Sequence, residues 1–414
     1  MKSMDFLVLM PALNWVTIGI IVWTSIYFYF RNAYNFWKKK GIKFPKPVAP
    51  FGNYKKVILG NQSITDFFIE KYFEFEDEPY FGVYEVTRPT LIDRGVTIDE
   101  ELDPLSAHLV NLSFPRWHTL RSKLSPVFTS GKLKLMLPLV LECVDHFKEA
   151  LQEKLGNGNS VNMSELLVRY FTDVIGTCGF GLQFNAIKGE HSEFRTMVKR
   201  MVASNLENAM KRLFMTVCPI VLKLFRIKVT PGGVTNFFIH TVKEVIEHRQ
   251  KYNVIRNDFV DQLVQLRKQG SMKSSKTLRK YPIASFVPRE CTKDYNIPGT
   301  SHKINRGQII QIPIAGLHYD PKFYANPEIF NPENFSSDAK ASRPSCAYIP
   351  FGEGPRICIG LRFAFLGMKS VICTLITNFT FSTCEKTVIP MELDPRGFLS
   401  TPKTPIWLKV NKLK

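Results

Sequence analysis

The sequence predicts a mainly α-helical protein with small β-sheets, which follows an N-terminal transmembrane helix. Phe6 to Phe30 contains no charged residue, and from about residue 60 to 270 apolar residues recur at three- and four-residue spacing, as in amphipathic helices. Short β-forming runs separated by turn residues follow from about residue 283 to 315. The 414 residues are 45% hydrophobic and 22% charged, which excludes a disordered chain and a polytopic membrane protein.

The N-terminal apolar run is long enough to cross a bilayer. As a helix, its 25 residues would extend about 37 Å at ~1.5 Å per residue, against a hydrocarbon core of ~30 Å. Basic residues follow from Arg31 to Lys46, so the positive-inside rule places the rest of the chain in the cytoplasm. A cleaved signal peptide is the alternative, but the run ends in aromatic rather than small residues. We expect a membrane anchor at 1–30, a basic, proline-rich linker at 31–53 and a body at 54–414.

The body is predicted to be helical first, then to contain a small amount of sheet, and then one more helix. The predicted helices are Leu133–Leu155, Met163–Phe180 and Val234–Leu266. The predicted strands lie within Ile283–Pro288, Tyr295–Gly299 and Gly307–Pro313. Residues 320–357 are expected to be irregular, and a last helix at Leu361–Phe379 is expected to precede strand-like C-terminal segments.

One of the cysteines stands apart from the others. Eight cysteines are too few for a disulfide scaffold, and seven of them are expected to be buried small hydrophobes. Cys358 instead lies in a glycine-rich turn directly before the predicted last helix, where backbone N–H groups and the helix dipole favour a thiolate. Gly354 and Gly360 allow a flat ligand to approach, Arg356 can pair with its carboxylates, and Phe351 offers an aromatic face. This chemistry suggests an iron macrocycle with acidic side groups; the alternative is a glycine-rich turn with a chance cysteine.

Several motifs together resemble a known family. Phe351-x-x-Gly354-x-Arg356-x-Cys358-x-Gly360 resembles the haem-binding signature of the cytochrome P450 family. Trp117-His-Thr-Leu-Arg121 is similar to the family's W-x-x-x-R helix, Thr277-Leu-Arg279 to the end of its E-x-x-R helix, and Asn326 to Phe335 to its meander. The resemblance covers nearly the whole chain and is nearest to the microsomal insect family-6 type.

The resemblance implies a fold, a cofactor and partners. The fold would be that of a cytochrome P450, and Cys358 would be the iron ligand and catalytic centre of haem b (iron protoporphyrin IX). The remaining implied haem contacts are Arg356, Phe351, Gly354, Gly360, Trp117, Arg121 and Arg289. Electrons would come from NADPH through a flavoprotein reductase, with cytochrome b5 as a further partner. The chain would oxidise small lipophilic compounds with dioxygen at the endoplasmic reticulum membrane, with its body facing the cytoplasm.

Parts of the family pattern are missing from this chain. No A-G-x-x-T motif of the distal central helix precedes Thr277, and a second gap is expected near Leu91 to Arg94. Lys276 stands where the family has the E-x-x-R glutamate, and Asn334 stands where the meander has an arginine. A buried Arg279 would then be an unpaired charge, at a cost of about 3–5 kcal/mol. Skipped coding segments or a faulty gene model would explain both gaps.

Three functions follow from these observations. The first is a membrane-anchored haem-thiolate monooxygenase, the second a catalytically inactive truncated relative that retains the anchor, with or without haem, and the third a membrane-tethered basic protein that binds no haem. The formal charge of +19 suggests an anionic partner, but no aromatic-basic platform indicates nucleic acid. We attribute the charge to the cluster after the anchor and to a reductase-docking face at Arg116, Lys123, Lys132 and Lys134, with a generally solvated basic surface as the alternative. His118 and His318 are expected to be structural rather than donors at the haem edge.

Overall fold

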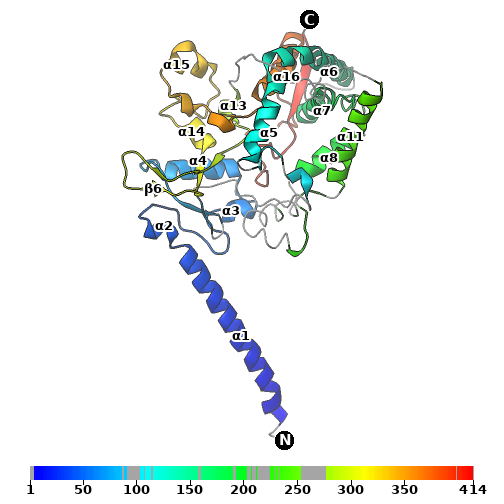
Figure 1. Ribbon diagram of the computed structural model, residues 1–414. Helices are drawn as coiled ribbons and strands as arrows, with labels where there is room; N and C mark the ends of the chain where they lie inside the picture. The colour runs from blue at the N-terminus through cyan, green and yellow to red at the C-terminus, as the bar shows by residue number, and fades with distance from the viewer. Residues whose placement is uncertain are drawn as a thin grey trace.

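The protein is described here by a computed structural model with a helical body and small sheets (Figure 1). The described residues are 4–85, 88–90, 103–106, 108–112, 115–156, 160–189, 193–202, 207, 211, 224–228, 230–231, 233–252, 277–397 and 399–413. The main helices are α1 (Met4–Ala33), α2 (Phe36–Lys39), α3 (Lys55–Ile58), α4 (Ile64–Glu74), α5 (Arg116–Leu124), α6 (Ser130–Gly156), α7 (Met163–Ile175), α8 (Glu193–Val202), α11 (Val234–Tyr252), α13 (Thr277–Lys280), α14 (Ile314–Tyr319), α15 (Ser337–Ala341) and α16 (Leu361–Asn378).

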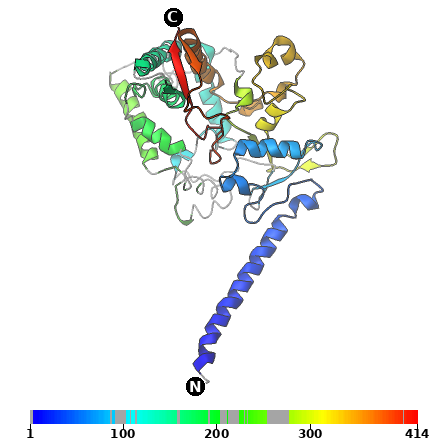
Figure 2. The same ribbon diagram turned by 180° about the vertical axis from the view of Figure 1, so that it is seen from behind.

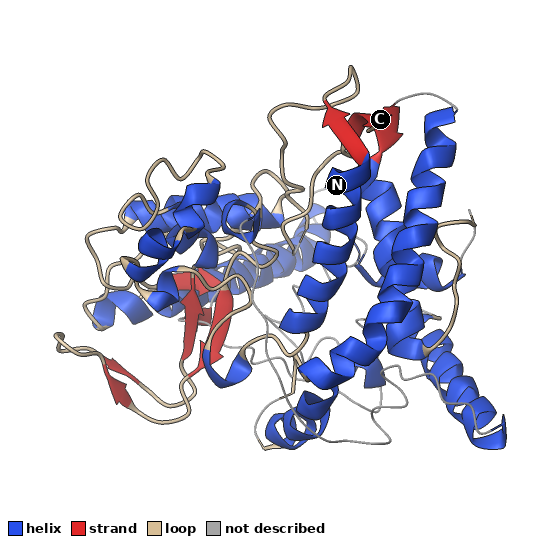
Figure 3. Cartoon of the chain, turned by 90° about the horizontal axis from the view of Figure 1, so that it is seen from above, coloured by secondary structure: helices blue, strands red, loops and turns tan. Residues whose placement is uncertain are grey.

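The strands form small antiparallel sheets (Figure 3). β1 (Val83–Glu85) pairs with β2 (Arg88–Thr90), and β5 (Tyr295–Asn296) pairs with β6 (Lys303–Ile304). β4 (Val287–Glu290) pairs with β7 (Ile309–Ile312), so that Val287 lies opposite Ile312. The remaining sheet has three strands in the order β3 (Ser160–Asn162), β9 (Trp407–Lys412), β8 (Phe379–Ser382). The prediction of a mainly helical protein with small sheets is confirmed.

The first helix projects from the body, as both opposite views show (Figures 1 and 2). The chain is then fixed to the body by Trp37 and Tyr84, both of which are 0% exposed. The Trp37 N–H donates to the Tyr84 hydroxyl at 3.0 Å, and that hydroxyl donates to the Tyr34 carbonyl at 2.8 Å. An alanine at Gly82 would place its Cβ 2.4 Å from the Trp37 ring, so the indole packs directly on the backbone.

The main core lies between α6, α7 and α16. Met136, Val140, Val144 and Phe147 of α6 belong to the same buried cluster, because residues at this spacing lie on one face of a helix. Within the described residues, α16 is the helix whose length and hydropathy would suffice for a membrane span. We interpret it as a core helix, since it packs on α6.

Some sequence predictions changed in detail. Predicted helix Leu133–Leu155 is α6, whereas predicted helix Met163–Phe180 ends as an α-helix at Ile175 and continues as a π-helical turn over Gly176–Phe180. The residues after Tyr252 in the predicted helix Val234–Leu266 lie outside the described part of the chain.

The cysteines also depart from expectation. Cys143 and Cys178 are buried as predicted, but Cys346 and Cys373 are exposed and Cys291 and Cys384 are only half-buried, so the expectation of burial is wrong for the exposed pair and not fully met at the other two. Cys218 lies outside the described residues. Cys373 lies on the outward face of α16, and Cys346 lies in a short 3-10 helix, Ser345–Ala347, that follows α15. Neither place could be read from the composition around each cysteine.

Candidate active site

The turn that carries Cys358 is shaped by glycines and by backbone hydrogen bonds. Gly352 and Gly354 have φ angles of +75° and +77°, in the left-handed region that glycine adopts without strain. A short 3-10 helix, Gly354–Arg356, follows. The N–H of Cys358 then donates to the carbonyl of Phe351 at 3.0 Å. The thiol is therefore held on a closed loop directly before α16 begins at Leu361.

The environment of the Cys358 sulfur contains opposing influences. The side chain keeps an exposed surface, yet desolvation by the surrounding protein raises the pKa of the thiol. The N–H groups of Gly360 and Leu361 and the charge of Arg121 lower that pKa, but burial outweighs them. The expected effect of the helix N-terminus is therefore present, but desolvation outweighs it in the thiol as it stands. A bound metal ion deprotonates a coordinating thiol outright.

Helix α5 is brought against this turn by an arginine. The Arg356 guanidinium lies 3.9 Å from the centre of the Trp117 ring and donates to the carbonyl of Leu112 at 3.1 Å. Trp117 is 8% exposed, so this cation–π contact is largely shielded from water, where such contacts are strongest. Arg121 lies one turn further along α5, close enough to Cys358 for their charges to interact.

A third arginine approaches from β4. Arg289 donates to the carbonyl of Glu353 at 2.9 Å and to that of Pro288 at 2.8 Å. Its guanidinium would lie 3.4 Å from a Cβ added at Gly352, so it closely contacts the turn. The structure thus brings together the residues that the sequence singled out: the Cys358 turn, the two α5 residues and Arg289.

The donor set fits an iron macrocycle with acidic side groups. The charge of Arg121 acts on the thiol, while Arg289 and Arg356 lie at the turn and bond neutral carbonyls. Carboxylates of a bound group would be stronger acceptors than carbonyls. A Cβ added at Gly354 would meet nothing within 4 Å, and the Phe351 ring is fixed edge-on to Phe365 at 5.2 Å.

Arg279, expected to carry an unpaired charge, is hydrogen-bonded to backbone carbonyls. It is 2% exposed, and its guanidinium donates to the carbonyls of His318, Pro327 and Ile329 at 3.0, 2.7 and 3.1 Å. It also lies 5.3 Å from the centre of the Tyr324 ring. The expectation is wrong because carbonyl dipoles and an aromatic face stabilise a buried cation without a carboxylate.

A second arginine shares these surroundings. Arg343 lies 4.4 Å from the centre of the Tyr324 ring and donates to the carbonyl of Asn334 at 3.0 Å. The sequence pointed to Asn334 as the place of a lost arginine and missed Arg343, which follows it in the chain. Lys276, the other residue of that expectation, lies outside the described residues.

Of the two candidate histidines, His318 is structural, whereas the expectation for His118 stays a prediction. His118 is exposed on α5 beside Trp117, whereas His318 is 0% exposed on α14. Burial lowers the pKa of His318 to about 4, so the ring is neutral at neutral pH. No sequence signal indicated the partners of His318, because they are backbone groups.

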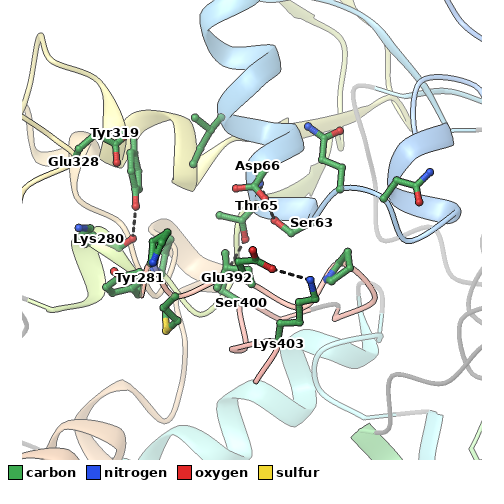
Figure 4. A pocket seen from close by; sticks show the side chains of 18 of the residues that line it. Ser63, Thr65, Asp66, Lys280, Tyr281, Tyr319, Glu328, Glu392, Ser400 and Lys403 are labelled. Atoms are coloured by element: carbon green, nitrogen blue, oxygen red, sulfur yellow. Dashed lines mark hydrogen bonds and ion pairs between the residues drawn. The ribbon is translucent and has the colours of Figure 1, made fainter. Parts of the chain in front are cut away.

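A separate polar pocket of about 520 Å³ lies between α4, the end of α13 and the C-terminal loops (Figure 4). Its polar side chains already bond one another. Thr65 and Ser400 of the lining form a hydroxyl cluster with the buried Ser285, with Oγ distances of 2.6, 3.0 and 3.4 Å. Lys403 pairs with Glu392 at 2.7 Å. The pocket contains none of the residues that surround Cys358.

Comparisons with known proteins point to one family. A family model described as Cytochrome P450 matches residues 92–277 and 275–409. The chain is 28% identical to Cytochrome P450 6A1 of Musca domestica, with 96% of this chain and 97% of the relative covered. It is 29% identical to Probable cytochrome P450 6a21 of Drosophila melanogaster, with 92% and 96% covered.

The same comparisons bear on the two gaps. The first alignment spans 497 positions, 83 more than the 414 residues of this chain. The family model matches in two pieces that meet at residues 275–277. From the fold, from the cysteine turn with its arginines and from these matches, we conclude that the chain belongs to the cytochrome P450 family and is a haem-thiolate monooxygenase that acts on lipophilic compounds.

Proposed function

We propose that Cys358 is the thiolate ligand of haem b and that Arg121, Arg289 and Arg356 bind its propionates. The observation that carries this assignment is the contact of Arg356 with Trp117 at 3.9 Å, because it joins the cysteine turn to α5. The bound haem would supply the dioxygen and redox chemistry. The protein would hold the sulfur on its closed loop, with Gly354 and Gly360 leaving room for the ring and Phe351 beside it.

A carbon-monoxide difference spectrum of the reduced full chain tests this assignment. We expect a thiolate-type Soret band in the unmodified protein and its loss in Cys358→Ala. Cys346→Ala is a matched control, since Cys346 is also exposed but lies outside the turn. A band that persisted in Cys358→Ala would show that another residue binds the iron. Turnover of a lipophilic substrate with reductase and NADPH, without cytochrome b5 and with it, then tests the electron supply.

We further propose that the reductase docks on the basic residues around the cysteine turn. Arg116 and Lys123 lie on α5, and Lys132 and Lys134 lie at the start of α6. Phe128, just before α6, would lie 4.0 Å from a Cβ added at Gly360. Basic residues therefore flank the turn, where an acidic partner would bring its electron donor close to Cys358.

Charge reversal tests the docking face. Lys123→Glu with Lys134→Glu should weaken reductase affinity and flatten its dependence on salt, since both effects arise from charge attraction. Lys322→Glu with Lys340→Glu changes the net charge equally at exposed positions between α14 and the end of α15. If both pairs of substitutions changed affinity equally, net charge rather than a docking face would be responsible.

We propose that α1 anchors the chain in the endoplasmic reticulum membrane through residues 1–30, with 31–53 as the linker and 54–414 as a cytoplasmic body. Large apolar and aromatic side chains of α1 are exposed, including Trp23 at 69% and Phe28 at 57%, which suits contact with lipid. The full chain expressed in cells should resist carbonate extraction, and its body should be cleaved by protease added to intact microsomes. Extraction with carbonate would contradict the anchor.

We also propose that this chain lacks the distal central helix of its relatives. The split of the family match at residues 275–277 and the missing A-G-x-x-T motif support this. Sequencing the transcript across the Ile92–Asp93 junction and from Met272 to Lys276 tests it. Recovery of extra coding sequence at those two places would show that the segments exist in the gene and are skipped here.

A further inference from the structure

His318 lies between two segments that are distant in the chain. It is 0% exposed on α14, and its ring stacks on Tyr348 with centroids 5.3 Å apart and planes at 20°. On one side lies the end of α13 at Arg279, and on the other lies Ile349, at the start of the segment that leads into the cysteine turn.

The partners of His318 determine its tautomer. The N–H of Ile349 can only donate, so Nε2, at 3.2 Å, must be the acceptor. The proton is therefore on Nδ1, which donates to the carbonyl of Arg279 at 3.1 Å. In return, the Arg279 guanidinium donates to the carbonyl of His318 at 3.0 Å. Two reciprocal hydrogen bonds thus join Arg279 and His318, and a third joins His318 to Ile349.

From Ile349 a short series of backbone bonds leads to the metal-binding cysteine. The carbonyl of Ile349 accepts from the N–H of Gly352 at 2.9 Å. The carbonyl of Phe351, the residue before that glycine, accepts from the N–H of Cys358 at 3.0 Å. The path from His318 to the backbone of Cys358 therefore consists of the hydrogen bond to Ile349, two backbone hydrogen bonds and the peptide link between Phe351 and Gly352.

We propose that His318 is a positioning residue that fixes the Cys358 loop by accepting the N–H of Ile349, and so sets the place of the sulfur under the iron. This inference rests on haem binding at Cys358, as proposed above. The low pKa of His318 supports it, since a neutral ring leaves Nε2 free to accept at physiological pH.

Hydrogen exchange of the haem-free full chain tests the positioning role directly. His318→Phe keeps a ring that can stack on Tyr348 but removes both ring hydrogen bonds. We expect exchange to accelerate about five- to tenfold in residues 349–360, the factor that loss of one buried hydrogen bond implies. Exchange in residues 133–151 of α6 should not change. Equal acceleration in both segments, or none in 349–360, would overturn the proposal.

Two further variants separate positioning from general loss of stability. Tyr319→Phe removes a hydroxyl bond of 3.0 Å to the carbonyl of Lys280, beside the bonds between Arg279 and His318 but without a link to Ile349. It should leave exchange in 349–360 unchanged. His318→Gln can accept at one end and donate at the other, so it should restore at least half of the lost protection. Failure of the glutamine variant to restore any protection would contradict the hydrogen-bonding argument.

The haem-loaded protein gives an independent readout. His318→Phe should lower the ratio of thiolate-type to neutral-thiol-type Soret bands at least threefold, whereas Tyr319→Phe should not. If the unmodified chain gave no thiolate-type band, the haem assignment would fail, and the exchange comparison would still decide whether His318 fixes the loop. If the band ratio were unaffected while exchange accelerated, His318 would stabilise the loop without positioning the sulfur, and the proposal would be wrong.

Discussion

Replacement of the buried Arg279 by methionine distinguishes two opposite accounts of its charge. Methionine has nearly the same length but neither charge nor hydrogen-bond donors. If Arg279 were an uncompensated buried cation, its removal would stabilise the protein, as replacement of buried charges by apolar residues often does by about 1–4 kcal/mol. The structure instead gives Arg279 three carbonyl acceptors between 2.7 and 3.1 Å, so we expect a loss.

The size of this loss follows from the contacts. Hydrogen bonds from a charged donor contribute about 1.5–3 kcal/mol each, so three of them correspond to about 5–9 kcal/mol. Burial of a methionine side chain returns about 1.5–3 kcal/mol. The net loss is then about 3–6 kcal/mol, a large part of the ~5–15 kcal/mol that stabilises a typical domain.

Urea unfolding of the full chain in detergent measures this loss as a change in midpoint at constant slope. Arg306→Met is the matched control, since Arg306 is exposed and its replacement should change the unfolding free energy by less than about 0.5 kcal/mol. An Arg279→Met variant as stable as the unmodified protein, or more stable, would refute the reasoning.

Three other perturbations have definite expected outcomes. The pKa of His318 is about 4 in the folded protein, below the ~6.5 of an unfolded histidine, so the unfolded state takes up the proton first; stability therefore decreases as the pH is lowered from about 6.5 to about 4, by about 3 kcal/mol. Urea unfolding at a series of pH values should show this decrease in the unmodified protein and not in His318→Phe, in which Arg279 and Arg343 still face the site. Trp117→Leu removes the contact with Arg356 at 3.9 Å, and a double-mutant cycle of the two residues should give a coupling of about 0.5–2 kcal/mol, whereas zero coupling would show that the contact contributes nothing. Gly316→Ala would place a Cβ 2.5 Å from a tyrosine of α4 and should cost about 1–3 kcal/mol, whereas Gly156→Ala, which meets nothing within 4 Å, should cost nothing measurable.

The helices could be predicted because their information is local. On α6, the buried residues Met136, Val140, Val144 and Phe147 repeat at the spacing of one helical face, which the sequence displays directly. The cysteine turn could be predicted for a similar reason, because its glycines, arginine and sulfur lie within ten residues of the chain. Strand bounds were less accurate, since β4 begins at Val287, after most of the predicted run from Ile283.

The surroundings of the buried charges could not be predicted. Arg279 bonds carbonyls that lie 39 to 50 residues further along the chain, and every residue has such a carbonyl. A missing glutamate can be seen in a sequence, but three backbone acceptors and an aromatic ring that take its place cannot. The same applies to His318, whose partners are the backbone groups of Arg279 and Ile349. At Cys358 the effect of the helix N-terminus on the thiol pKa could be read from the sequence, whereas the desolvation that outweighs it could not.

The junction between α1 and the body has a mechanical consequence. Trp37 is locked against Gly82 and Tyr84, and the Asn53 side chain bonds the backbone of Tyr84 at 2.6 Å and that of Pro45 at 2.8 Å. The linker is therefore not a flexible one, and a tilt of α1 would rotate the body with it. If α1 spans a bilayer, as proposed, its tilt would determine which side of the body faces the lipid. The orientational entropy that a body on a flexible linker keeps would already have been lost on folding.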